Sequence, residues 1–404
     1  MSAVRAVLRD PHWYRDAAGA GLQALAALLL TLAWAARDPD LPRVAWAAFA
    51  GVGLCGWLFL ITAARSARLA ATGAGELRGL LLVAMLLAQI GFVLRLSARE
   101  PVVPGLEWVV FMISALLFLA AYEVARRPVH QMLWIATVGV LLAGSVAAVV
   151  ATPHGVLEPR LYWRQALPAA VLAAAVSGAV VLGCMWRRDR VMREAVRAHV
   201  VAVPPLAVYA FTRDPGAATL VCGATAGAVL GAGRVLWRSS WTATFRPIGT
   251  GVAAVAAVTT VLWLFDPWKV AVREPAPARD LVGVARETAG AVSLADVGGR
   301  AGELVLTLLV LVFALQVGLL AARAARPDAE LPDRHAFQRV WAVALGGQVL
   351  ASLLAPLLVG VLRLPAPPTL TTLPFAADGA SFVVTFAALG LLFAAAQRPP
   401  AGVL

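Results

Sequence analysis

Charged side chains gather in one stretch of this chain, Pro267–Glu303. Two carboxylates, Asp296 and Glu303, lie near the end of the stretch, and a carboxylate can accept the proton of an attacking hydroxyl group. Positive charge in the stretch comes from five side chains, Lys269, Arg273, Arg279, Arg286 and Arg300. Arginine binds phosphate groups by planar two-point contacts, so such cations can stabilise negative charge. Because 61% of the chain is hydrophobic, chemistry on polar substrates needs a water-exposed place, and this stretch provides one.

The composition predicts an all-α, polytopic integral membrane protein. Only 14% of the residues are charged, whereas a soluble domain carries about a quarter. Apolar runs close to the ~20 residues that cross a bilayer as a helix recur along the whole chain. We therefore expect helical spans to surround and position the charged stretch.

Twelve apolar runs predict twelve transmembrane helices. They are Ala18–Ala36, Val44–Ala64, Gly79–Leu94, Pro104–Ala125, Gln131–Ala151, Leu167–Trp186, Val196–Thr212, Gly216–Gly233, Pro247–Phe265, Leu304–Ala322, Gln338–Leu362 and Ala380–Ala396. The first run is expected to be an uncleaved transmembrane helix and not a signal peptide, because it is long and another span follows at once.

The distribution of arginine orients these spans. With the N-terminus inside, the inner segments hold 21 of the 34 Lys and Arg residues but only 9 of the 22 acidic residues. The net charge is then +12 inside and 0 outside, as the positive-inside rule requires. Both termini are predicted to be cytoplasmic, and the long loop extracytoplasmic. The basic charge is thus a topology signal, and no nucleic-acid partner is expected.

Three glycines in one predicted span, Gly223, Gly227 and Gly231, repeat every fourth residue. Small residues at this spacing let two helix backbones approach closely in a membrane. The pattern predicts a tight helix–helix contact.

No metal site or cofactor is indicated by the sequence. The three cysteines lie singly in apolar runs, without a CxxC pair, and the histidines form no HExxH motif. A glycine pattern at 51–56 fits GxGxxG, but it lies inside a predicted span and not after a strand.

Four short motifs occur in the order found in a known family. Tyr209–Val221 resembles the signature LLQPDLGTALV, and Phe265–Trp268 resembles the FLDPW that enters a large outer loop. Gly302–Leu304 resembles the GEELG that leaves that loop, and Leu373–Ser381 resembles LPFISYGGSS. Together these motifs resemble the SEDS family, membrane proteins of the FtsW, RodA and SpoVE kind. The resemblance covers about Leu161–Gln397.

The resemblance divides the chain into residues 1–160, with five N-terminal spans, and 161–404, a SEDS-like core with its outer loop at 267–303. SEDS proteins polymerise glycan from lipid II at the outer face of the bacterial cytoplasmic membrane, usually beside a class B penicillin-binding transpeptidase. The resemblance therefore implies a peptidoglycan glycosyltransferase that acts in division, shape or sporulation.

Roles for individual residues follow from this resemblance. Asp296 is expected to be the general base, with Glu303 as the second candidate. Asp214 is expected to be structural or to orient the substrate rather than to accept the proton, and Ser381 is expected to contact the substrate. The cations expected to bind the pyrophosphate are Arg213, Lys269, Arg273 and Arg300. A divalent cation between carboxylate and phosphate is the only cofactor considered.

Two other functions stay open at this point. The segment 377–382 reads ADGASF in place of SYGGSS, which fits a non-catalytic relative that binds or flips a lipid-linked precursor or scaffolds a wall synthase. A transporter is the third alternative, but it should show repeats between its halves and charges near the membrane centre. The glycosyltransferase requires a loop carboxylate for polymerisation and the non-catalytic relative does not, so this requirement distinguishes the two functions.

Overall fold

Seven of the twelve predicted helices fall in the part of the chain that the computed structural model describes. The described residues are 104–126, 131–151, 162–186, 215–245, 248, 294–327, 333–361 and 379–396. Their long helices are α5 (Pro104–Arg126), α6 (Gln131–Ala151), α7 (Tyr162–Trp186), α9 (Pro215–Gly231), α12 (Leu294–Ala324), α13 (Asp333–Val361) and α14 (Gly379–Ala396). A single π-helical turn, η3 (Ala232–Leu236), extends α9. These residues are helical throughout apart from short turns, so the all-α class is confirmed for them.

The predicted helix ends agree closely with the structure in most places. α5 and α6 begin at the predicted residues, and α9 and α14 begin one residue earlier. The largest difference is at α12, which begins at Leu294 and not at Leu304. The last ten residues assigned to the outer loop are therefore helical. The other five predicted helices lie outside the described residues, apart from Ile248 in Pro247–Phe265.

Two described segments are long and apolar enough to cross a membrane, Ala218–Leu236 and His335–Ala355. Leu116–Ala125, Met132–Ala147, Ala170–Met185, Val310–Ala324 and Val383–Ala396 are shorter apolar helical segments.

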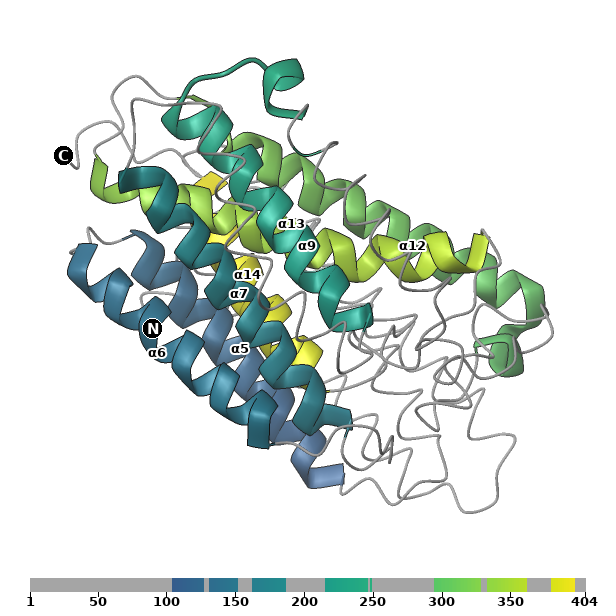
Figure 1. Cartoon of the computed structure of the whole chain (residues 1–404). Helices are drawn as coiled ribbons and strands as arrows, with labels where there is room; N and C mark the ends of the chain where they lie inside the picture. Colours follow the sequence, from purple (N-terminus) through teal and green to yellow (C-terminus); the bar gives the residue numbers. More distant parts are fainter. Residues whose placement is uncertain are drawn as a thin grey trace, which may run out of the picture.

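α13 is the central helix of the bundle and packs against α7, α9, α12 and α14 (Figure 1). Two side chains of α13 tie it to α7. The indole N–H of Trp341 donates to the carbonyl of Ala174 at 3.0 Å, and the amide N–H of Gln348 donates to that of Ala170 at 2.9 Å. The later residue of α13 contacts the earlier residue of α7, so the two helices are antiparallel.

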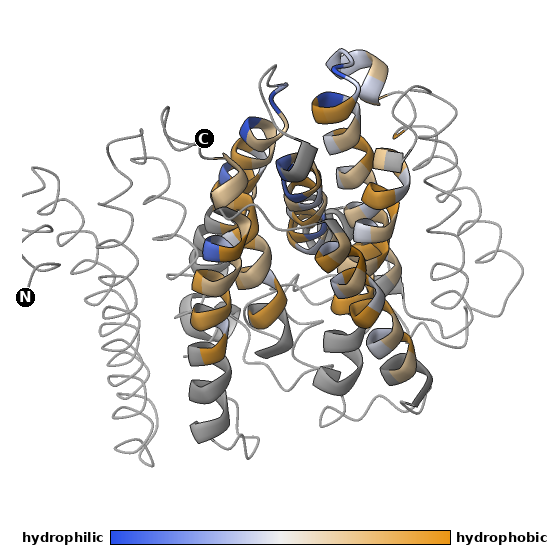
Figure 2. Cartoon of the chain, turned by 90° about the vertical axis from the view of Figure 1, so that its left-hand side faces the viewer, coloured by the Kyte–Doolittle hydropathy of each residue, from blue (hydrophilic) through white to orange (hydrophobic). Residues whose placement is uncertain are grey.

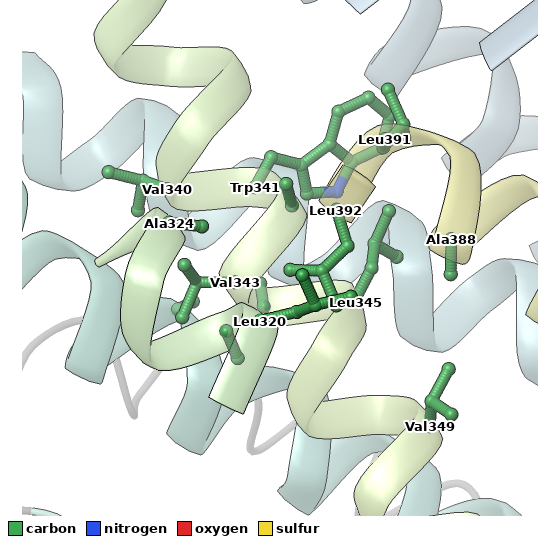
Figure 3. Packing of buried hydrophobic residues seen from close by; sticks show 14 of the residues in the cluster. Leu320, Ala324, Val340, Trp341, Val343, Leu345, Val349, Ala388, Leu391 and Leu392 are labelled. Carbon is green, nitrogen blue, oxygen red and sulfur yellow. The ribbon is translucent and has the colours of Figure 1, made fainter. Parts of the chain in front are cut away.

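The other neighbours of α13 run in the same direction as α7. Gly231 at the end of α9 lies beside Val340, near the start of α13. Arg339 reaches the carbonyl groups at the C-terminal end of α12. Leu392 of α14 lies beside Gly346, and Figure 3 shows Leu391 next to Trp341 with Ala388 further toward Val349, so α14 also runs antiparallel to α13. α7, α9, α12 and α14 are therefore mutually parallel, and all begin at the end of the bundle where α13 finishes.

The glycine stripe of α9 forms the close contact that its spacing predicts. A Cβ atom built on Gly227 would lie 2.8 Å from the carbonyl oxygen of Val343 and 2.9 Å from the Cα of Ala344. The stripe faces Gly347 of α13, which is itself in backbone contact with α9. The prediction of a tight helix–helix contact is confirmed.

The core between α12, α13 and α14 is filled mostly by aliphatic side chains, with the ring of Trp341 among them (Figure 3). Aromatic rings close it on two sides. Trp134 of α6 lies against Phe337 and Trp341 with ring centroids 5.4 and 5.5 Å apart, and Phe118 of α5 meets Phe393 of α14 edge-on at 5.6 Å. These contacts bury large apolar areas and fix which helices are neighbours.

The outward faces of the outer helices are apolar as well. Leu116 of α5, Val140 of α6 and Leu315 of α12 are more than half exposed. Figure 2 shows hydrophobic colour along the bodies of the helices, with hydrophilic residues most frequent near their upper ends. The bundle therefore has an apolar interior and apolar sides.

Candidate functional site

Three of the predicted site residues lie in the first turns of α12. Asp296, Arg300 and Glu303 occupy helix positions i, i+4 and i+7, so they fall on one face of α12. The predicted outer loop, 267–303, contains all three positions. A helical backbone instead fixes the spacing between the three positions.

The register of these positions differs from that of the exposed leucines of α12. Eighteen residues make five turns of an α-helix, so Asp296 shares its register with Ala314 and Glu303 with Ala321. Ala314 and Ala321 are buried against the bundle. The exposed residues Leu308, Leu315 and Leu319 follow another line along the helix. Positions 296 and 303 therefore continue the register of the packed side of α12.

Ser381 lies in the first turn of α14, two residues after Gly379. α14 and α12 begin at the same end of the bundle, because both are antiparallel to α13. The structure thus brings Ser381, Asp296, Arg300 and Glu303 to one end. α9 also begins at this end, at Pro215, where proline costs no hydrogen bond.

Four predicted site residues lie outside the described residues: Arg213, Asp214, Lys269 and Arg273. The sequence connects the first two directly to the start of α9. Their roles remain predictions.

The opposite end of the bundle carries a polar arrangement that the sequence reading missed. Arg234 of η3 donates a hydrogen bond to the carbonyl oxygen of Ser239, and its guanidinium carbon lies 4.6 Å from the ring centroid of Trp241. The rings of Trp241 and Phe245 are stacked with centroids 5.9 Å apart. The signal was present in the sequence, as aromatic residues at 237, 241 and 245 with Arg234 before the first and Arg238 between the first two.

Three buried side-chain oxygen atoms lie on separate helices of the bundle. Gln348 Oε1, Gln316 Oε1 and Thr225 Oγ1 are buried without a hydrogen-bond partner. None of the three side chains ionises, so they offer polarity but no acid–base chemistry. Among the residues that the structure describes, no three His, Cys, Asp or Glu side chains are grouped so as to hold a metal ion.

No protein-family model matches the chain, and no curated protein matches it with significant similarity. The resemblance to the SEDS family therefore depends on the four sequence motifs.

Proposed function

We propose that this chain is a polytopic membrane protein of about twelve helices, and a SEDS-type peptidoglycan glycosyltransferase that polymerises lipid II. One observation carries the proposal. The helices that bear three of the motifs, α9, α12 and α14, all begin at the same end of the bundle. Motifs separated by more than a hundred residues can thus act on one substrate.

The apolar sides of the bundle support the membrane location. Leu308, Leu315 and Leu319 form an exposed stripe along α12, and α6 exposes Met132 and Val140. In water, so large an apolar surface promotes aggregation, whereas lipid tails cover it without loss. The two longest apolar segments, Ala218–Leu236 and His335–Ala355, are suited to the same surroundings.

The end of the bundle where α12 begins fits the outer membrane face. The opposite end holds Arg234, Arg238, Arg323 and Arg326, which is the side that the positive-inside rule assigns to the cytoplasm. A lipid-linked sugar at the outer face would present its pyrophosphate at the level of the helix starts.

The proposed reaction joins two lipid-linked disaccharides. A sugar hydroxyl oxygen attacks the anomeric carbon of the donor, and the bond from that carbon to the pyrophosphate oxygen breaks. The hydroxyl proton passes to the carboxylate of Asp296, and the polyprenyl pyrophosphate leaves with the bonding electron pair. Arg300 lies one turn from Asp296 on α12, where its positive charge stabilises the leaving group.

Polymerisation of lipid II by the purified full-length chain tests the proposal. Asp296→Ala should abolish polymer formation while lipid II binding is retained. If Asp296→Ala polymerises normally and Glu303→Ala does not, the base is Glu303. Glu123→Ala is the control, because Glu123 is a carboxylate of α5 near the arginine-rich end.

Failure of the wild-type chain to polymerise lipid II would contradict the glycosyltransferase. If the wild type still binds lipid II, the non-catalytic relative that binds, flips or scaffolds replaces it. A class B penicillin-binding transpeptidase is the partner that we propose for either function.

A further inference from the structure

The turn after α9 is a firmly built element at the arginine-rich end of the bundle. Arg238 has a φ of 49°, a left-handed conformation that reverses the chain after η3. The Ser240 hydroxyl accepts a hydrogen bond from the backbone N–H of Ala243 at 3.2 Å and so caps the short helix 241–245. Thr244 is buried against Gly233: a Cβ atom built on Gly233 would lie 2.5 Å from the Thr244 methyl group. The short helix is thereby fixed to the end of α9.

This attachment turns two aromatic rings outward. Trp241 is 37% exposed and Phe245 is 53% exposed. Both therefore present apolar ring surface on the outside of the bundle. The two rings are stacked at an interplanar angle of 24°, so they form one continuous apolar surface. Tryptophan and other amphipathic rings collect at the boundary between lipid tails and headgroups.

The charges beside the rings have a single sign. Within the described segment Ala232–Phe245 the ionisable side chains are Arg234 and Arg238, and none is acidic. Arg234 is held against the Trp241 ring, and Arg238 is exposed. A cation next to an exposed ring complements a lipid with a negative headgroup, because the ring enters the lipid while the cation meets the phosphate.

We propose that Trp237–Phe245 is an anchor that binds anionic phospholipid headgroups on the arginine-rich side of the bundle. The stacked rings favour a lipid over a free phosphate ion, since a free ion leaves them in water. The segment directly follows Ala218–Leu236, which is apolar and long enough to cross a membrane. The anchor rests on the proposed membrane location and does not depend on the polymerase chemistry.

Lipid retention by the full-length chain tests the anchor. The protein is purified in detergent, mixed with equal amounts of phosphatidylglycerol and phosphatidylcholine, and the bound lipids are counted by native mass spectrometry. The wild type should retain phosphatidylglycerol preferentially. Arg238→Asn should lower this preference about fivefold, the effect of removing one cation near a membrane surface. Asparagine tolerates the left-handed backbone at this position, so the turn is preserved.

Two further variants separate the anchor from charge alone. Trp241→Ala with Phe245→Ala should also lower phosphatidylglycerol retention, although no charge is removed. Arg326→Gln is the matched control: Arg326 is an exposed arginine near the same end, in the short turn after α12. Its substitution should leave retention unchanged.

The outcomes that overturn the anchor are distinct. An equal loss in Arg238→Asn and Arg326→Gln would mean that only net charge attracts the lipid. Unchanged retention in the Trp241→Ala, Phe245→Ala variant, or competition by inorganic phosphate as strong as that by phosphatidylglycerol, would also refute it. Release of the wild-type chain from vesicles by alkaline washing would instead refute the membrane location.

Discussion

Gly227 of α9 and Gly347 of α13 meet backbone to backbone, and a Cβ atom built on Gly347 would lie 3.0 Å from the Cα of Gly227. A contact this close leaves room for no side chain on either helix. It lies between the bundle's central helix and α9, whose first residue directly follows Arg213 and Asp214 in the chain. The two helices can approach this closely because both residues at the contact are glycines, which have only a hydrogen atom in place of a side chain.

Gly227→Ala should destabilise the bundle. The added methyl group would meet backbone atoms of Val343 and Ala344, and backbone cannot rotate away, so the helices must separate. Overpacking of this kind costs about 1–3 kcal/mol. The thermal unfolding midpoint in detergent measures the loss. Gly318→Ala in α12 is the control, because a Cβ atom there meets nothing within 4 Å. Equal midpoints for both variants would contradict the contact.

Arg339→Lys should loosen the C-terminal end of α12. The Arg339 guanidinium donates to the carbonyl of Ala324 at 3.1 Å and to that of Arg326 at 2.9 Å. These carbonyls lie at the helix end, where intrahelical donors are missing. Lysine keeps the charge but loses the planar fork that spans two acceptors.

Hydrogen exchange of the backbone amides at 322–327 measures that loosening. We expect exchange to be faster by about fivefold to tenfold, the equivalent of one lost hydrogen bond. Exchange in the middle of α13 serves as the internal control. Unchanged protection at 322–327 in the variant would show that the two hydrogen bonds are dispensable.

Moving the Asp296 carboxylate by one residue should abolish polymerisation. Asp296→Ala with Val297→Asp keeps the net charge but moves the carboxylate by about 100° around α12. Misplacement of a catalytic group costs about a hundredfold or more in rate. Polymer yield from lipid II measures it, with Asp296→Glu as the variant that keeps the register. Full activity of the shifted carboxylate would exclude a general base fixed by the helix.

Reporter fusions should divide the chain between two sides of the membrane. Fusions after Ser240 and after Arg326 follow helices that end together, so both should report the cytoplasm. A fusion after Gly290, ahead of α12, should report the opposite side. Accessibility of a cleavable tag at each site gives the measurement. Finding Gly290 on the same side as Ser240 would refute the proposed topology.

The sequence predicts the described helices well because each is marked locally. Prolines at 104 and 215 open α5 and α9, and the apolar runs have helical length. The start of α12 was wrong by ten residues because Asp296, Arg300 and Glu303 lower the hydropathy of its first turns. A hydropathy reading locates the apolar part of a helix, and polar turns that extend it carry no such signal.

The partners of each helix were beyond the sequence reading. The spacing of Gly223, Gly227 and Gly231 indicates that some helix approaches closely, but nothing local identifies α13 as that helix. The hydrogen bonds from Trp341 and Gln348 to α7 join residues more than 160 positions apart in the sequence, and no local sequence pattern predicts such pairs. For the same reason the sequence could rank Asp296 and Ser381 as candidates without showing that α12 and α14 begin at one end.

In the proposed membrane protein, the shared direction of α7, α9 and α12 makes the orientation of later helices depend on whether the number of membrane crossings is odd or even. Trp186 ends α7 at the arginine-rich end and Pro215 begins α9 at the opposite end, and Leu236 and Leu294 are related in the same way. Loss of a single crossing would invert every later helix and send the arginines at the end of α12 outward, against the insertion preference for inner positive charge. A deletion that removes two crossings keeps the later helices upright. Evolution can therefore lengthen or shorten this chain most easily by pairs of helices.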